Sequence, residues 1–370
     1  MPNASIINQR ATQSFLKALQ ASIWSHPLDP AFFEELSPAQ WQQIVKLSLT
    51  QAVEGLVCQS IQNLPGEHLP NKELLMKWIV RQQRVISYNE QVCQTISFTN
   101  SLFRENGINA VLLKGMAVAQ YYPAPLLRTG GDIDWYFPSI SDFQMANKLM
   151  AIHGEDYRIQ SRIDTDYRIG KVPVEHHRRL INMYNPFVQK FISMFEMEER
   201  SSVRSKHIAK GNIQVPSPMA EILLINTHIL HHQIGYGIGL RQLCDAALLY
   251  RHHHGEYDKE HLKFAYKKLG ILRWAEAHHS MLVEVLDVDE EFLPFAPKRH
   301  SKWNDQTLEL ILRGGNFSFY DPGNPDIETP FSRVNRPQRL SNSFYRNIRV
   351  APMEAISFPF TQIYRKYLPL

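Results

Sequence analysis

Cysteine is scarce in this sequence of 370 residues. Its three cysteines are Cys58, Cys93 and Cys244, and no two of them form a CxxC pair. This spacing argues against a disulfide framework and against a thiolate zinc site, and it suits a reducing compartment. No stretch approaches the roughly 18 apolar residues that a membrane helix requires, and the first residues do not resemble a signal peptide. We therefore expect a cytoplasmic protein with no membrane association.

The excess of positive charge is small. The formal net charge is +4, with 44% hydrophobic and 21% charged residues, which is an ordinary globular composition. A dedicated nucleic-acid-binding protein usually carries a clustered basic face, and no long basic stripe is visible here. We therefore expect no extended nucleic-acid binding. The length is sufficient for two or three domains.

The spacing of apolar residues divides the chain into four parts. Residues 1–106 have helical periodicity that ends at Gly107, which predicts an N-terminal helical region. Residues 107–215 combine short apolar runs with glycine turns and predict an α+β core. Helical periodicity returns over residues 216–300 and predicts a C-terminal helical domain. Residues 301–370 are rich in Pro, Asn and Arg, which predicts an irregular tail that packs on the core.

Three segments of the core have the patterns of β-strands. Residues 108–113 form a short apolar run, as in a buried strand. Residues 132–137 alternate strictly and predict a half-buried strand with its acids on the open face. Residues 157–180 predict a hairpin with a polar turn near residues 164–166. Because proline cannot donate to a ladder, Pro173 predicts that the second arm is an edge strand or contains a bulge.

Two acidic residues lie close together on the predicted strand. Asp132 and Asp134 are at positions i and i+2, so their side chains project from one face. Carboxylates this close repel one another unless a cation neutralises them, and oxygen ligands of this kind suit magnesium. Glu175, in the VEHH segment, is the candidate for a third ligand and is expected to share a face with His177. The alternative is that both aspartates are ordinary residues on a solvated strand.

A glycine turn precedes the acids. Gly115 follows the first apolar run and precedes a predicted short helix over residues 116–122. Glycine lets the backbone approach a phosphate, and the N-terminus of a helix offers free N–H groups. Lys114 would add a positive charge, and Gly131 would leave room for a nucleotide beside the acids. Arg128 would reach phosphates or the acids, or would form a surface ion pair instead.

The C-terminal helical domain contains two pairs at helical spacing. His228 and His232 share one face, but the glutamate of a zinc-binding HExxH motif is missing, so packing or lining the active-site wall is the favoured role. Arg241 and Asp245 are also four residues apart. On a helix surface such an ion pair contributes only a few tenths of a kcal/mol.

Taken together, three segments resemble a known family. The chain is similar to the bacterial uncharacterised nucleotidyltransferases, within the superfamily that includes polymerase β. The similarity lies in three segments, LLKGMAVAQYYPAPLLRTGGDIDWYF, VEHHRRL and HILHH…GLRQLCDAALL. The resemblance covers roughly residues 70–285 and implies a small mixed β-sheet with helices. It implies catalytic, metal-binding roles for Asp132, Asp134 and Glu175, with Mg²⁺ or Mn²⁺ as the cofactor. It also places Lys114, Gly115 and Arg128 near the nucleotide, and matches His177, Arg241 and Asp245 to positions of a possible substrate cleft.

The resemblance implies a transferase that moves an NMP group from an NTP to an acceptor hydroxyl, by in-line attack between two metal ions. The expected acceptor is a small molecule, a peptide or a protein. The superfamily usually has glycine or serine after the turn glycine, whereas this chain has Met116. That departure favours a binding module without catalysis. An enzyme that places AMP on a partner protein, as in toxin–antitoxin systems, is a further hypothesis, and so is a helical scaffold with a chance acid pair.

Overall fold

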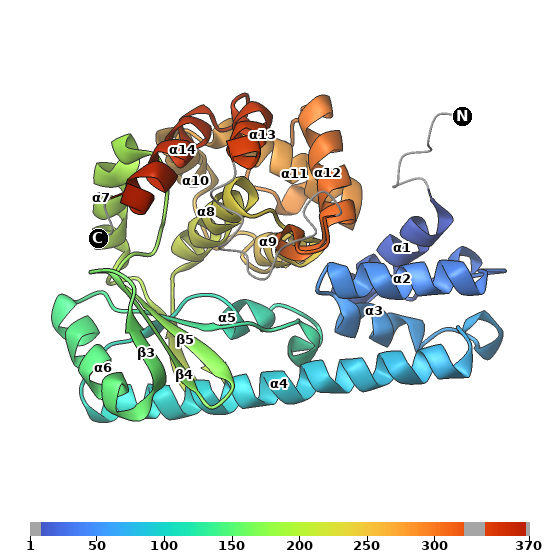
Figure 1. The fold of residues 1–370 in the computed structure, drawn as a ribbon, viewed down its shortest axis with the longest axis horizontal. Coiled ribbons are helices and arrows are strands. Elements are labelled where there is room, and N and C mark those ends of the chain that lie inside the picture. Colours follow the sequence, from blue (N-terminus) through green and yellow to red (C-terminus); the bar gives the residue numbers. More distant parts are fainter. Residues whose placement is uncertain (1–8, 322–336, 368–370) are drawn as a thin grey trace.

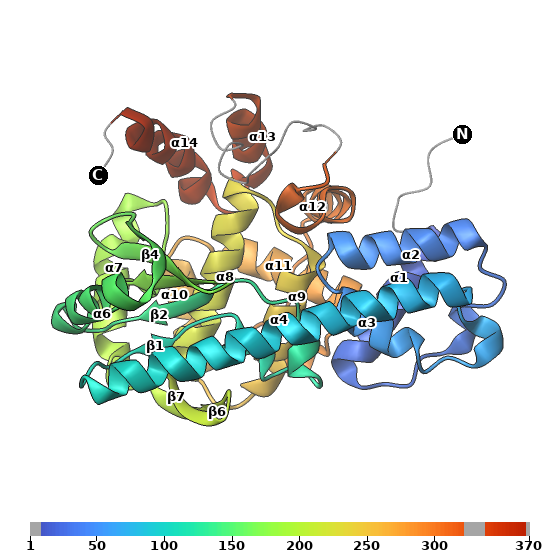
Figure 2. The same ribbon diagram turned by 60° about the horizontal axis from the view of Figure 1, so that its bottom comes forward.

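The computed structural model describes residues 9–321 and 337–367. Its N-terminal part is helical, as predicted for the described residues up to 106. The helices are α1 (Arg10–Trp24), α2 (Pro38–Thr50), α3 (Glu54–Ile61) and α4 (Lys72–Glu105), joined by the 3-10 turns η2 (Pro30–Phe32) and η3 (Gly66–His68). Helix α4 has 34 residues, so it is about 51 Å long at 1.5 Å per residue. It connects α1–α3 with the β-sheet (Figures 1 and 2).

Five strands form one mixed sheet, which confirms the predicted α+β fold. The strands are β1 (Val111–Leu112), β2 (Ile133–Tyr136), β3 (Glu155–Ile159), β4 (Asp164–Ile169) and β5 (Val172–His177). Their spatial order is β1-β2-β5-β4-β3. Strand β2 runs parallel to β5, and the other neighbouring strands are antiparallel.

The sheet differs from its sequence-based prediction in two respects. Residues 157–180 form parts of three strands rather than a hairpin, because the predicted turn near residues 164–166 lies within β4. Strand β5 is also internal rather than an edge strand. Its Pro173 is tolerated because the parallel pairing with β2 begins one residue later, where Val174 lies opposite Ile133.

Strand β2 is buried on both faces, so the prediction of an open acidic face is wrong for Asp134, whereas Asp132 precedes the strand and is half-buried. Ile133 and Trp135 belong to a core cluster beneath the sheet, where Phe103 of α4 meets the Trp135 ring edge-on at 5.7 Å. Tyr136, on the acidic face, packs into the second and larger core cluster. Asp134 is only 1% exposed, which makes its charge sensitive to nearby side chains.

Further elements lie between the strands of the sheet or follow its last strand. The short helices are α5 (Met116–Ala119), η4 (Pro125–Leu127) and η5 (Pro186–Val188), the longer ones are α6 (Ile140–His153) and α7 (Gln189–Glu199), and a hairpin is formed by β6 (Arg204–Ile208) and β7 (Gly211–Val215). Helix α6 ends at Gly154, as predicted. The sequence analysis did not identify α7 or the hairpin.

The C-terminal part is helical throughout its described residues. It contains α8 (Pro218–Gly235), α9 (Leu240–His252), α10 (Lys259–Lys268), α11 (Leu272–Leu286), η6 (Glu290–Phe292), α12 (Ser301–Gly314), η7 (Asn316–Ser318), α13 (Pro337–Asn347) and α14 (Pro352–Tyr367). Residues 301–314, 337–347 and 352–367 are thus helical where the sequence suggested an irregular tail; residues 322–336 and 368–370 of that segment lie outside the described residues. Helices α13 and α14 pack against α8.

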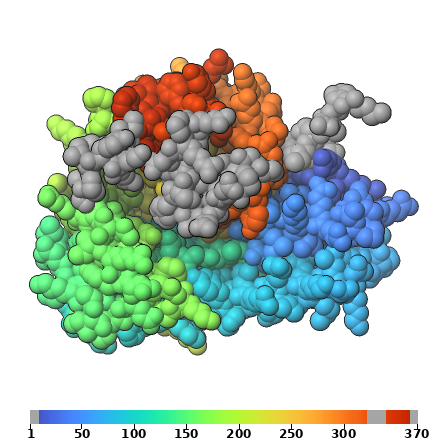
Figure 3. Space-filling model, in the orientation of Figure 1, coloured from blue at the N-terminus to red at the C-terminus, as the bar shows by residue number. Residues whose placement is uncertain are grey.

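In Figure 3 the orange helices adjoin the blue N-terminal ones. The division of the chain into four parts stays a prediction.

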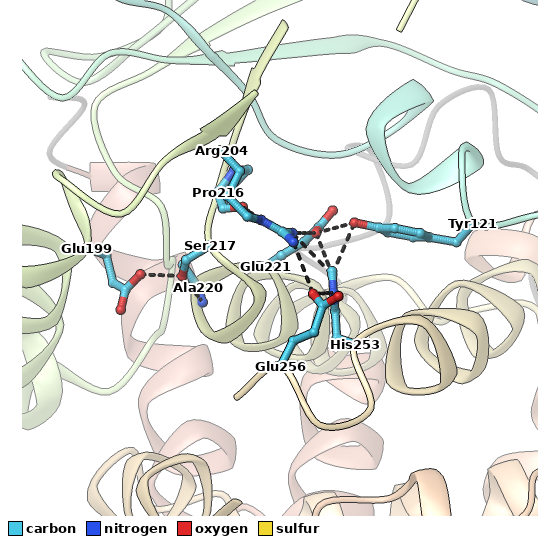
Figure 4. Close-up of polar contacts among 9 residues, drawn as sticks. All are labelled: Tyr121, Glu199, Arg204, Pro216, Ser217, Ala220, Glu221, His253 and Glu256. Atoms are coloured by element: carbon cyan, nitrogen blue, oxygen red, sulfur yellow. Dashed lines mark hydrogen bonds and ion pairs between the residues drawn. The ribbon is translucent and has the colours of Figure 1, made fainter. Parts of the chain in front are cut away.

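A buried carboxylate anchors the β6–β7 hairpin (Figure 4). Glu221 of α8 is fully buried, and its Oε2 accepts a hydrogen bond of 2.5 Å from the Tyr121 hydroxyl. The same oxygen lies 2.9 Å from Nε2 of His253 and 3.5 Å from Nη2 of Arg204. Lys206 of the hairpin places its ammonium 3.5 Å from the centre of the Tyr121 ring. The network therefore ties β6 to α8, α9 and the segment after α5.

Acid is expected to destabilise the C-terminal helices. His278 and His279 of α11 are fully buried, and burial lowers the pKa of each imidazole to about 3. As the pH falls below about 6.5, the unfolded chain binds protons that the folded chain cannot. The free energy of unfolding should therefore fall by about 1.4 kcal/mol per pH unit for each histidine, down to about pH 3. Urea denaturation at a series of pH values measures this slope.

His278→Phe isolates one of these contributions. The His278 ring stacks on Trp274 at 4.9 Å, and within the described residues neither ring nitrogen has a hydrogen-bond partner. Phenylalanine keeps the stacking and cannot be protonated, so the slope should decrease by about 1.4 kcal/mol per pH unit. The exposed His261 supplies the control, His261→Phe, which should leave the slope unchanged. An equal slope in His278→Phe and wild type would contradict the prediction.

None of the helices in the described ranges combines the length and the apolar character that crossing a membrane requires.

Candidate functional site

The parallel pairing of β2 and β5 brings three predicted site residues together. Asp134 lies directly opposite Glu175, and Tyr136 lies opposite His177. Nε2 of His177 is 2.9 Å from Oδ1 of Asp134 and 3.3 Å from Oε2 of Glu175. One ligand atom from each of Asp134, Glu175 and His177 can be chosen so that all lie within 4.8 Å of one another. His177 is therefore part of the acidic centre rather than of a separate cleft.

Asp132 and Asp134 have opposite pKa shifts. The negative charge of Asp134, together with burial, raises the pKa of Asp132 to about 6. Burial also opposes ionisation of Asp134, but Lys114 and His177 outweigh it and hold its pKa below the usual range. The Lys114 ammonium lies 3.0 Å from Oδ1 of Asp134. Burial disfavours the charge of Lys114 too, yet the neighbouring acids raise its pKa.

The imidazole of His177 is held by acids on three strands. Besides Asp134 and Glu175, it contacts Asp164 of β4, whose Oδ1 is 3.0 Å from Nδ1. Burial lowers the pKa of His177, but hydrogen bonds to the three carboxylates raise it well above its usual value. The ring is therefore an imidazolium cation at neutral pH, and with Lys114 it neutralises much of the acidic charge.

The donor set fits a divalent cation. Oδ2 of Asp134 is buried without a hydrogen-bond partner among the described residues, and so is Oδ1 of Asp166. Asp166 lies opposite Glu175 in the β4–β5 ladder. Buried carboxylate oxygens are rarely left unpaired, and carboxylates are the ligands that Mg²⁺ and Mn²⁺ prefer. Glu175 remains partly exposed, so the centre is open to solvent at this residue.

Sequence reasoning missed Asp164 and Asp166. Both were assigned to a turn, although they stand two residues apart, as Asp132 and Asp134 do. This spacing is the signal that could have identified a second acidic strand, because alternate residues of a strand share a face.

The Gly115 turn has a positive φ of +57°, and a Cβ there would lie 3.1 Å from the carbonyl oxygen of Asp132. The turn therefore requires glycine and lies against the acids. Met116 is buried in the core beneath the sheet, so its side chain does not occupy the space above the turn. Helix α5 has only four residues, which is too short for the helix-dipole contribution that the sequence suggested.

The loop formed by residues 128–131 is fixed by α4. The Asn89 amide donates to the carbonyl oxygens of Leu126 and Arg128 at 2.7 and 2.8 Å. A Cβ on Gly130 would be 2.2 Å from Oδ1 of Asn89, so only glycine permits this approach. The Tyr88 hydroxyl donates to the carbonyl oxygen of Gly131 at 2.7 Å. Sequence reasoning identified neither Tyr88 nor Asn89, because their helical spacing resembles that of core residues.

Arg128 binds Asp245 of α9. Its Nε and Nη2 each lie 2.7 Å from a carboxylate oxygen of Asp245, and the Tyr122 hydroxyl donates to the same carboxylate at 2.7 Å. Arg128 is 5% exposed, so this pair is an internal link between the loop and α9 rather than a surface ion pair. Arg241 instead donates from Nη1 to the carbonyl oxygen of Thr129 at 3.1 Å. The expected surface ion pair of Arg241 with Asp245 is thus replaced by the pairing of Asp245 with Arg128.

His228 and His232 form a neutral pair on α8. Their Nε2 atoms are 2.9 Å apart. Burial, together with the positive charge of Lys114, lowers the pKa of both well below its usual value. Within residues 9–321 and 337–367, the one group of three or more side chains suited to a metal ion is Asp134, Glu175 and His177. The histidine pair is not part of it, and its role in lining the active-site wall stays a prediction.

Comparison with known proteins agrees with this geometry. A family model described as uncharacterised nucleotidyltransferase matches residues 37–287, which is about two thirds of the chain and includes the acids, the Gly115 turn and the Arg128–Asp245 link. No curated protein and no solved structure gave a significant match. The match confirms the resemblance inferred from the sequence motifs. The chain belongs to the family of uncharacterised nucleotidyltransferases.

Proposed function

We propose that the chain is a metal-dependent nucleotidyltransferase that moves an NMP group from an NTP to an acceptor hydroxyl. The observation that carries the proposal is the pairing of Asp134 with Glu175 across parallel strands, together with a carboxylate oxygen of Asp134 that has no hydrogen-bond partner among the described residues. Family membership supports the same chemistry. A chance acid pair on a solvated strand would not be buried in this way.

Asp134 and Glu175 belong to the group of side chains suited to a metal ion and would hold Mg²⁺ or Mn²⁺. Asp132 lies outside that group and is proposed as a third carboxylate ligand, whereas His177 would be a ligand only as the neutral imidazole. When bound, the ion would neutralise the carboxylates and stabilise the charge that develops on the transferred phosphoryl group. Lys114 would contribute a second positive charge beside the phosphates. Gly115 and Gly131 are the proposed points of close backbone approach to the nucleotide.

The proposed reaction forms one bond and breaks one. The acceptor oxygen bonds to the α-phosphorus, the bond from that phosphorus to the bridging oxygen of the β-phosphate breaks, and pyrophosphate leaves. Glu175 is the most accessible of the acids, with a side chain that is 42% exposed. We assign to its carboxylate the acceptance of the hydroxyl proton, since a base must lie within hydrogen-bond reach of the proton that it takes.

We propose that Arg128 positions the loop formed by residues 128–131 and does not contact phosphate. Its guanidinium is already bound to Asp245 on two sides. The interaction fixes residues 128–131, which lead directly into Asp132. Arg241 binds the carbonyl oxygen of Thr129 in the same loop, and we propose that its positive charge favours anionic groups of the substrate on the other side of this loop.

Manganese binding tests the proposed metal site. Glu175→Gln removes one negative ligand and should weaken Mn²⁺ binding at least about tenfold, which corresponds to about 1.4 kcal/mol. Paramagnetic resonance of free Mn²⁺ during a titration measures the affinity. The exposed Glu155 of β3 supplies the control, Glu155→Gln, which should bind as tightly as wild type. No binding to wild type, or equal affinity in both variants, would count against the site.

A further inference from the structure

A pocket lies beside the loop that leads into the acidic centre. It has a volume of about 240 Å³ and lies between the start of α3, the middle of α4 and the loop before β2; the lining residues that matter here are Glu54, Arg81, Arg84, Tyr88, Thr129 and Gly130. We propose that this pocket binds a phosphate- or carboxylate-bearing part of a substrate of the transferase. The inference rests on the proposed function and assigns a ligand class to a place that the acidic residues do not occupy.

The pocket is adjacent to the acids along the chain and in space. Gly130 lines it and stands two residues before Asp132. Tyr88, another lining residue, donates its hydroxyl hydrogen to the carbonyl oxygen of Gly131. Burial and the negative charge of Asp132 both raise the pKa of that hydroxyl. A substrate group held in the pocket would therefore be close to the acidic centre.

The pocket has an excess of positive charge. Arg81 and Arg84 extend from α4 with exposed side chains. Among the residues that the structure describes, no carboxylate lies within ion-pair distance of either guanidinium. Glu54 is the one acid in the wall, and its Oε2 accepts a hydrogen bond of 3.2 Å from the Thr129 hydroxyl.

A third arginine lies behind the wall. Arg241 donates to the carbonyl oxygen of Thr129, the lining residue that also binds Glu54. Its buried Nε has no hydrogen-bond partner within the described residues. Burial and the positive charge of Arg128 lower the pKa of Arg241. A bound anion nearby would stabilise the charged form of this guanidinium group. Arg81 and Arg84 thus line the pocket, Arg241 lies behind it, and Glu54 is the one acid among the described lining residues, which favours an anionic ligand.

Volume and donor geometry narrow the class of ligand. At about 30 Å³ for each water molecule, the pocket holds roughly eight waters. That volume accommodates a phosphate or carboxylate with a few further atoms. Planar guanidinium groups bind both kinds of anion through paired hydrogen bonds. The group can belong to the acceptor or to the nucleotide, and the experiment distinguishes these two sources.

Inorganic phosphate is the probe for the pocket. Calorimetric titration without divalent metal compares wild type with Arg81→Gln/Arg84→Gln and with the control Arg104→Gln. Arg104 is an exposed arginine near the end of the same helix. The double variant should bind phosphate at least about fivefold more weakly, while the control should match wild type. Equal affinity in all three proteins, or equal loss in the double variant and the control, would overturn the proposal.

Titration of the same proteins with ATP and Mg²⁺ identifies the source of the anion. Unchanged nucleotide affinity in the double variant would assign the pocket to the acceptor, and a loss of at least about fivefold would assign it to the nucleotide. Either assignment holds only if the double variant also binds inorganic phosphate more weakly than wild type. Failure of wild type to bind any nucleotide would contradict the proposed function and leave the phosphate comparison interpretable. Phosphate binding that does not depend on Arg81 and Arg84 would overturn the proposal for the pocket alone.

Discussion

Replacing Asp134 by alanine is expected to lower the rate of nucleotidyl transfer at least about a hundredfold, as removal of a group that stabilises transition-state charge generally does. The substitution removes the carboxylate that faces Glu175 across the parallel pair, and with it the buried oxygen that has no partner among the described residues. Transfer can be followed with NTPs labelled at the α-phosphate, through incorporation of label into acceptors of a cell extract.

The same substitution should also destabilise the fold, contrary to what the sequence alone suggests. From the sequence, removal of one of two neighbouring acids only relieves repulsion. In the structure, Asp134 is the partner of Lys114 at 3.0 Å and of His177 at 2.9 Å, and both cations are largely buried. Loss of one partner of a buried pair typically costs about 3 to 5 kcal/mol, because the other charge stays desolvated.

Two further variants separate catalysis from stability. Asp134→Asn preserves the side-chain shape, so a protein that melts normally and transfers no label would locate the defect in the site. Asp156→Asn changes an exposed aspartate of β3 whose ion pair with Arg168 is long, at 3.7 Å, and should leave both activity and melting temperature unchanged. Wild-type transfer by folded Asp134→Ala would refute its assigned role.

Arg128→Met and Asp245→Leu are each expected to lower the free energy of unfolding by about 3 to 5 kcal/mol. The two side chains form a doubly hydrogen-bonded pair that is 6% and 8% exposed. Tyr122 donates to the same carboxylate. Either single replacement leaves a buried charge without its partner. The double replacement removes both charges and should therefore cost less than the sum of the two single ones.

A double-mutant cycle measured by urea denaturation gives the coupling energy. The matched control is the exposed pair of Arg299 and Glu284, at 3.1 Å with side chains 42% and 40% exposed. Exposed pairs of this kind contribute about 1 kcal/mol or less. Single replacements of Arg128 or Asp245 that cost no more than those of the control pair would contradict an internal link between the loop and α9.

The parts of the fold that could be predicted are those governed by local pattern. Helix α4 follows from its apolar spacing and ends at Glu105, two residues before Gly107, and α6 ends at His153 with Gly154 as its C-cap. The alternation around Asp134 identifies β2, because a two-residue period is a property of the strand itself. Spacing alone also suggested that Glu175 and His177 share a face, and His177 indeed contacts both Glu175 and Asp134.

The other features depend on contacts between distant segments. Nothing local indicates that Asp164 of β4 binds His177, since strand register is set by the whole sheet. The partner of Arg128 lies 117 residues further along the chain, so the local i, i+4 rule assigned Asp245 to Arg241 instead. Helices α13 and α14 of the C-terminal segment likewise pack against α8, and tertiary packing contributes more to helix stability than propensity does.

The central claim is that this site binds a nucleotide together with a divalent metal. Calorimetric titration of the wild-type protein with ATP, GTP, CTP and UTP, each with and without Mg²⁺, tests it most directly. The account predicts that at least one nucleotide binds with Mg²⁺, that its affinity falls at least about tenfold without the metal, and that Asp134→Asn abolishes the difference. Absence of binding for all four nucleotides in the presence of Mg²⁺ would contradict the account.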